Sequence, residues 1–172
     1  TDATLSVIFV NGASSDAQIE PASLTAPAGR VTLFDTGSLP SVPDGRYGII
    51  VSSISEPGLE ATGVVVEQVI NRRVGNTVGT SVVLGAPMGA ISTVWTAPSG
   101  ISSGIDDSIV VLNATPLDGT VTVSQIGPAG EVAIAGLESI ALPASGLVSI
   151  PVPAGISNGE VVIRATIPVV VQ

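Results

Sequence analysis

The chain of 172 residues contains no cysteine, no histidine and no lysine. It therefore has no disulfides, no thiolate or imidazole metal ligands, no lysine for a Schiff base, and no Ser–His or Cys–His catalytic pair. These absences exclude most enzyme chemistry, and we expect a protein that is not an enzyme.

Aromatic and basic residues are also scarce. Aromatic residues make up 2% of a sequence that is 45% hydrophobic, so we expect a core of Val, Ile, Leu and Ala. The net charge of −9 argues against a nucleic-acid partner, because that binding normally requires a basic surface. No apolar stretch approaches the roughly 18 residues that span a bilayer, so no membrane span is expected.

The surface must be hydrated largely by Ser, Thr, Gly and Asn, because only 11% of residues are charged. Such surfaces are common on secreted proteins, which favours an extracellular or cell-envelope location. The chain begins at Thr1 without an initiator Met or a signal pattern, as expected for a processed protein or an excised fragment.

Short β-branched runs bounded by Gly, Pro, Asn or Asp predict β-strands. The runs that show this pattern are residues 5–10, 46–51, 63–70, 108–112 and 160–164. Strict alternation in Thr120–Ser124 predicts a half-buried strand, with its two valines inward and its Thr and Ser side chains toward water. With 20 Gly and 13 Pro, no helix longer than a turn or two is expected.

Four blocks of sequence recur in the same order. Residues 8–11, 23–33, 44–49 and 63–67 match residues 110–113, 139–150, 158–163 and 168–172. The repeat predicts an all-β chain of two related antiparallel β-sandwich units, Ig-like or jelly-roll-like, at residues 1–88 and 89–172. The boundary falls within 71–104, and Asn11 is expected to superpose on Asn113.

Four segments carry a resemblance to a known family. They are Val64–Glu67, Gly85–Pro87, Trp95–Pro98 and Ile109–Asn113. In this order they resemble the repeat pattern of a family of uncharacterised β-sandwich proteins that actinobacteria and related bacteria secrete or display on their surface. The chain departs from that pattern at Ala114, where Pro is usual, and at Gln68, where Arg often follows the Glu. The resemblance implies an extracytoplasmic module and carries over no catalytic residues.

Oxygen-bearing side chains provide one candidate site. Asp106, Asp107, Asn113 and Asp118 form the densest group of the hard oxygen donors that calcium prefers. The alternative is that they are turn residues that hydrogen-bond their own backbone, because the spacing lacks the Asp-x-Asp-x-Asp pattern and downstream Glu of a calcium loop. We favour the turn interpretation and predict no other cofactor.

Trp95, the sole tryptophan, is the other candidate. An indole can stack on a sugar ring, or it can plug the junction between two units. We favour the plug, since a lone Trp in a Val-rich chain is more often buried. Arg72–Arg73, the only basic pair, is interpreted as local charge balance or as a contact for an anionic partner.

Together these observations predict a non-catalytic structural or interaction module of an extracellular or cell-envelope assembly, with a protein partner. The alternative is a carbohydrate-binding module that recognises cell-wall glycans. The oligomeric state does not follow from the sequence.

Overall fold

The computed structural model describes residues 1–12, 19–40, 42, 45–55, 60–99, 108–153, 156 and 159–172. Strands account for 57% of the structure, against the roughly 20–25% of typical globular domains. Within the described residues the only helical elements are two short 3₁₀ turns, Thr36–Ser38 and Met88–Ala90. The chain is therefore all-β with antiparallel sheets, as the sequence predicted. No helix in this part of the chain is long and apolar enough to cross a membrane.

Contacts between residues divide the chain into two compact units. Thr1–Phe9, Ile19–Pro43 and Ile49–Gly89 form the first unit, and Val10–Gln18, Asp44–Gly48 and Ala90–Gln172 form the second. Gly48 falls in the second of these units, beside Leu112, and the predicted division at residues 1–88 and 89–172 stays a prediction. A Cβ on Gly48 would lie 2.8 Å from Leu112 Cδ1, so glycine permits this close approach.

Most residues of a three-stranded sheet belong to the first unit. Its strands are β1 (Ala3–Asn11), β2 (Ala22–Ala26) and β3 (Tyr47–Ile54), in the order β2-β1-β3. In β1 the side chains of Ala3, Leu5, Val7 and Phe9 are buried, because alternate residues of a strand point to the same face. Phe9 stacks on Phe34 with the two ring centroids 6.4 Å apart.

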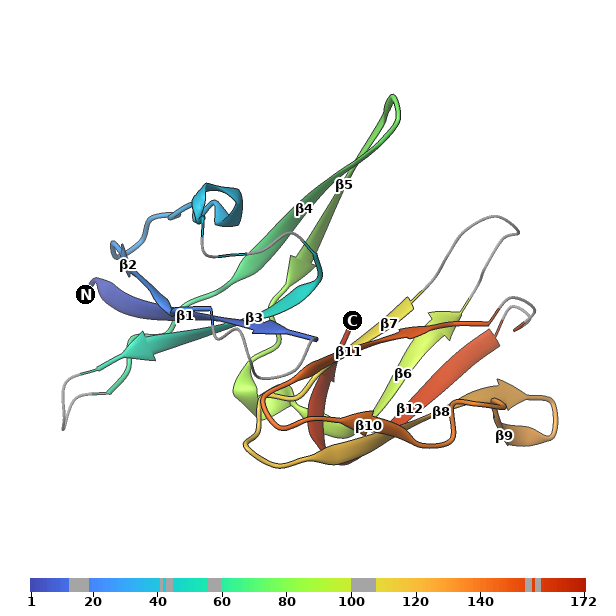
Figure 1. The fold of residues 1–172 in the computed structure, drawn as a ribbon. Coiled ribbons are helices and arrows are strands. Elements are labelled where there is room, and N and C mark those ends of the chain that lie inside the picture. The colour runs from blue at the N-terminus through green and yellow to red at the C-terminus, as the bar shows by residue number, and fades with distance from the viewer. Residues whose placement is uncertain are drawn as a thin grey trace. The chain divides into compact units, whose positions relative to one another are not determined.

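The first unit also contains a separate hairpin of β4 (Glu67–Val74) and β5 (Thr77–Leu84), the green two-stranded ribbon in Figure 1. Gly75, with a φ of 60°, supplies the left-handed conformation that its tight turn requires. The predicted strand at 63–70 is only partly correct, since β4 begins at Glu67 and Val65 lies outside any strand. A β-branched run forms a strand only where a neighbouring strand pairs with it.

In the described part of the second unit there are seven strands. They are β6 (Ser92–Ser99), β7 (Ser108–Leu112), β8 (Gly119–Gly127), β9 (Gly130–Ala133), β10 (Ile140–Leu142), β11 (Leu147–Pro151) and β12 (Gly159–Val171). The long strand β12 pairs with β6 and β8 along its first part. Farther on, Val169 still pairs with Ser92 of β6, and the last residues, Val170 and Val171, pair with β7. A register shift between Arg164 and Val169 separates these two parts. This strand therefore links the two groups of paired strands (Figure 1).

The core of the second unit is aliphatic, as predicted. Val121 and Val123 of β8 and Ile163 of β12 are fully buried. Ser124 was expected to face water with the other polar side chains of its strand, but it is only 3% exposed. Its hydroxyl donates a hydrogen bond to Glu131 of the neighbouring strand β9, which the sequence pattern of β8 alone does not indicate.

Strands from the repeated blocks differ in their pairing. β2 pairs with β1, whereas its counterpart in the repeat, β10, pairs with β8. Residues 31–33, the counterpart of β11, form no strand. The superposition of the two halves, with Asn11 over Asn113, stays a prediction.

Candidate functional site

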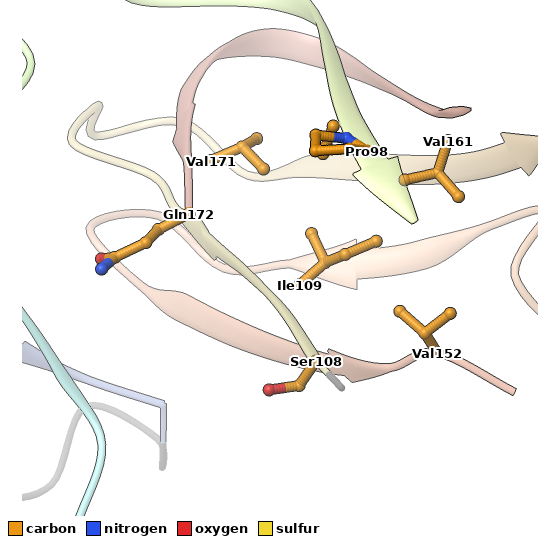
Figure 2. Close-up of a pocket in the computed structure, with 8 residues that line it drawn as sticks. Pro98, Ser108, Ile109, Val152, Val161, Val171 and Gln172 are labelled. Carbon is orange, nitrogen blue, oxygen red and sulfur yellow. The ribbon is translucent and has the colours of Figure 1, made fainter. Parts of the chain in front are cut away.

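An apolar pocket of about 150 Å³ opens at one end of the core of the second unit. Its lining comes from β6, β7 and β12 and from the residues just after β11 and β12, and comprises Ala97, Pro98, Ser108, Ile109, Val152, Val161, Val171 and Gln172. Figure 2 shows aliphatic side chains around the pocket, while the amide of Gln172 and the hydroxyl of Ser108 point away from them. A cavity of this volume holds about one six-membered ring. The pocket offers apolar contact and no ionisable side chain for acid–base chemistry.

Arg46 bonds Ser108, one of the residues that line this pocket, and was not singled out from the sequence. Its Nη1 donates hydrogen bonds to the hydroxyl of Ser149 and, at 2.6 Å, to the hydroxyl of Ser108. These bonds attach the segment before β3 to β7 and β11. The sequence drew attention to Tyr47 instead, which is partly buried.

Asn113 and Asp118, two of the four calcium candidates, serve the turns at the end of β7. The Asn113 side chain is fully buried, and its Nδ2 donates to the carbonyls of Leu117 and Pro143 at 2.8 and 2.7 Å. Its Oδ1 accepts from the amide and hydroxyl of Thr115 at 2.9 and 2.8 Å. Asp118 accepts a hydrogen bond from the amide of Ala144 at 2.8 Å.

The other two calcium candidates, Asp106 and Asp107, lie outside the described residues. Among the residues that are described, no three or more acidic side chains come close enough together to hold a metal ion. Asn113 Oδ1 accepts from the amide of Thr115 two residues on, which is the geometry of a turn residue that bonds nearby backbone. Asp118 instead accepts from Ala144, 26 residues away in the sequence.

Trp95 lies in β6, directly opposite Ile163 of β12. The indole is partly buried and packs against the aliphatic core of the second unit. Its Nε1 donates to the carbonyls of Ser92 and Val169 at 3.1 and 3.0 Å. The indole N–H is therefore already bonded to the backbone, and Trp95 contributes to packing within this unit.

Glu131 and Arg164 form an ion pair on the surface of the second unit. Two bonds join them, from Arg164 Nε to Glu131 Oε1 at 3.0 Å and from Arg164 Nη2 to Oε2 at 2.7 Å. These bonds, with the one from Ser124, lower the pKa of Glu131 from 4.5 to about 2. Because Glu131 is held as a paired carboxylate, it is poorly suited to accept or donate a proton near neutral pH. The sequence gave no sign of this pairing, since the two residues are far apart along the chain.

Large apolar side chains are exposed on the first unit. Val31, Leu33 and Val65 are between 82% and 90% exposed, and the hairpin of β4 and β5 carries more of them. The sequence analysis predicted a strand at 63–70 and gave no indication that these side chains are exposed. Their exposure marks a surface that contact with another molecule can bury.

Comparisons with known proteins add little to this geometry. No protein-family model matches the chain, and no curated protein matches it. Among solved structures it is similar to one described as Anabaena sensory rhodopsin transducer, with 23% identity and a TM-score of 0.37. That match covers 46% of this chain and 91% of the other. A similarity of this size carries no argument about function.

Proposed function

We propose that this protein is a non-catalytic structural or interaction module of an extracellular or cell-envelope assembly. The observation that carries the proposal is the apolar surface of the first unit, where Val31 and Leu33 are each 90% exposed. Val65 of the same unit is 82% exposed, and exposed apolar side chains of this size can serve as a site of protein contact. The partner that suits such a surface is another protein.

The available side chains support a role without catalysis. The sequence offers no His, Cys or Lys, and the lining of the pocket in the second unit is mostly apolar and includes no ionisable group. Glu131 is held as a carboxylate by Arg164. The net charge of −9 supports partners other than nucleic acids.

We also propose that the second unit is a β-sandwich. Its core cluster draws Ile109 and Ile150 from β7 and β11, and Val121 and Ile163 from β8 and β12. Two groups of strands that share one aliphatic core, with a bent strand passing between them, are expected of a sandwich. The resemblance to secreted actinobacterial repeat proteins supports this architecture, the internal repeat and the extracytoplasmic location.

Photo-crosslinking tests the proposed function. A photoreactive amino acid at position 33 is expected to form discrete protein adducts when the chain meets the envelope fraction of its source cells. The matched control is Leu117, which is 62% exposed on the second unit and is expected to give no such adducts. Equal labelling from both positions, or none from position 33, would contradict the proposal.

Binding to cell-wall polysaccharide separates this proposal from a carbohydrate-binding role. We expect no saturable binding. Saturable binding that Trp95→Ala removes while the fold is retained would replace the structural proposal with the glycan-binding one.

A further inference from the structure

Strand β5 presents an open edge that lacks the usual protection. Within the described residues it pairs only with β4, and its eight residues, Thr77–Leu84, include neither a charged residue nor a proline. Natural sheets commonly protect edge strands with charges, prolines or bulges, because an open edge can pair with another chain. A two-stranded hairpin is also only marginally stable by itself.

The pairing within the hairpin fixes which backbone groups of β5 face outward. The amide of Gly85 donates to the carbonyl of Val66 at 2.8 Å, just beyond the last paired residues, Glu67 and Leu84. Antiparallel ladders alternate between hydrogen-bonded and non-hydrogen-bonded pairs. Every second residue of β5 therefore directs its N–H and C=O away from β4. These residues are Val78, Thr80, Val82 and Leu84.

We propose that β5 pairs antiparallel with β5 of a second copy of this chain, centred on Ser81. In that register Val78 faces Leu84 of the second copy, and Thr80 faces Val82 of the second copy. All four outward-facing residues then exchange backbone hydrogen bonds, roughly eight in total across the pair. The contact is isologous, since both copies use the same strand. This proposal rests on the proposed role as an interaction module, and it adds that one partner is a second copy of the same chain.

The side chains on one face of the hairpin support this register. Val69, Val78, Val82 and Leu84 share that face and are between 56% and 64% exposed. In the four-stranded sheet, Val78 of each copy packs beside Leu84 of the other. Cross-strand apolar pairs of this kind stabilise antiparallel sheets.

The distribution of charge places the contact at this hairpin and limits it to two copies. Two chains of net charge −9 repel each other, but between residues 61 and 105 the only acidic residue is Glu67, against Arg72 and Arg73. The outer strand β4 carries these three charges. Charged residues discourage further edge pairing, so the assembly stops at a dimer.

Proline substitutions on the two edges of the hairpin test the proposal. Thr80→Pro removes an outward N–H of β5 and blocks the contact, while the ladder with β4 is kept. Asn71→Pro is the matched control, because Asn71 is opposite Thr80 and its N–H faces outward on the β4 edge. Both variants lose the same 2.8 Å hydrogen bond from the Thr80 hydroxyl to Asn71 Oδ1. Val82→Lys, which places a charge on the β5 edge, is a second blocking variant.

Sedimentation equilibrium of the whole chain, from roughly 10 µM to 1 mM, measures the association. We expect the unaltered chain and Asn71→Pro to form dimers with the same dissociation constant. We expect Thr80→Pro and Val82→Lys to weaken dimerisation at least tenfold, and a nuclear Overhauser contact between the backbone α-protons of positions 69 and 82, which face each other across the hairpin, confirms that each variant keeps its hairpin.

A chain that stays monomeric throughout, or one that dimerises equally in all four forms, overturns the pairing through β5. The crosslinking at position 33 is a separate measurement, because it detects proteins of the envelope fraction and not a second copy of this chain. The two proposals can therefore fail independently.

Discussion

Replacing Asn113 with alanine tests whether one buried amide holds the end of β7 to the turns around it. Asn113 is fully buried and makes four hydrogen bonds, to the carbonyls of Leu117 and Pro143 and to the amide and hydroxyl of Thr115. Alanine removes all four bonds. The amide thus links two turns that are 30 residues apart in the sequence.

The expected cost follows from the groups that lose their partner. A buried hydrogen bond contributes about 1 kcal/mol net, so four bonds set an upper range near 4 kcal/mol. Leu117 and Pro143 lie at the surface, and water can solvate their carbonyls in the variant. We therefore expect Asn113→Ala to lower the free energy of unfolding by about 2 to 3 kcal/mol. Asn113→Asp should cost at least as much, because a carboxylate oxygen then faces two carbonyl oxygens.

Urea unfolding at neutral pH, followed by tryptophan fluorescence, measures the change in the free energy of unfolding of the second unit. Trp95 is the only tryptophan and lies in the same unit as Asn113. Thr122→Ala is the control, because its hydroxyl makes one exposed hydrogen bond, to the carbonyl of Glu138 at 2.8 Å. The control is expected to cost about 1 kcal/mol or less. A cost for Asn113→Ala no larger than that of the control, or an Asn113→Asp variant as stable as the unaltered chain, would refute the reasoning.

Three further predictions concern the second unit. Because the pKa of Glu131 is lowered from 4.5 to about 2, its ion pair with Arg164 stabilises the fold above about pH 4.5, and this stability is lost as the pH falls toward 2. Glu131→Gln should remove that part of the pH dependence in unfolding measurements, and an unchanged pH profile would contradict it. Gly146→Ala should lower the free energy of unfolding in urea by about 1 to 3 kcal/mol, because the new Cβ would lie 2.9 Å from the Pro143 carbonyl oxygen. A stability equal to that of the unaltered chain would show that the turn tolerates a side chain. Trp95→Ala should lower the free energy of unfolding by about 3 kcal/mol by circular dichroism, whereas an unchanged melting temperature would indicate an indole that does not contribute to packing.

Local patterns predicted strands well where a partner strand was present. The run at Ser108–Leu112 is β7 with the same bounds, and Val121 and Val123 are buried as their alternation indicated. The same reasoning was wrong for Val65, since no pattern in its own segment reveals whether a neighbouring strand pairs with it.

Site residues were harder to predict from the sequence than strands. Asn113 stood out as an oxygen donor, but its bond to Pro143 depends on how the chain folds back on itself. The ion pair of Glu131 with Arg164 and the two hydroxyls bound by Arg46 likewise join residues that are distant along the chain. No short-range spacing carries such information.

The sequence by itself determined the class of fold and the chemistry available to the chain. β-Branched runs separated by Gly and Pro permit strands and exclude long helices, and a chain without His, Cys or Lys lacks most catalytic groups, whatever its fold. The tertiary structure alone decided which strands pair, that Ser124 is buried beneath Glu131, and that the β5 edge stays open within the described residues. The physical reason is that composition and periodicity act over a few residues, whereas strand pairing and burial depend on segments brought together from across the chain.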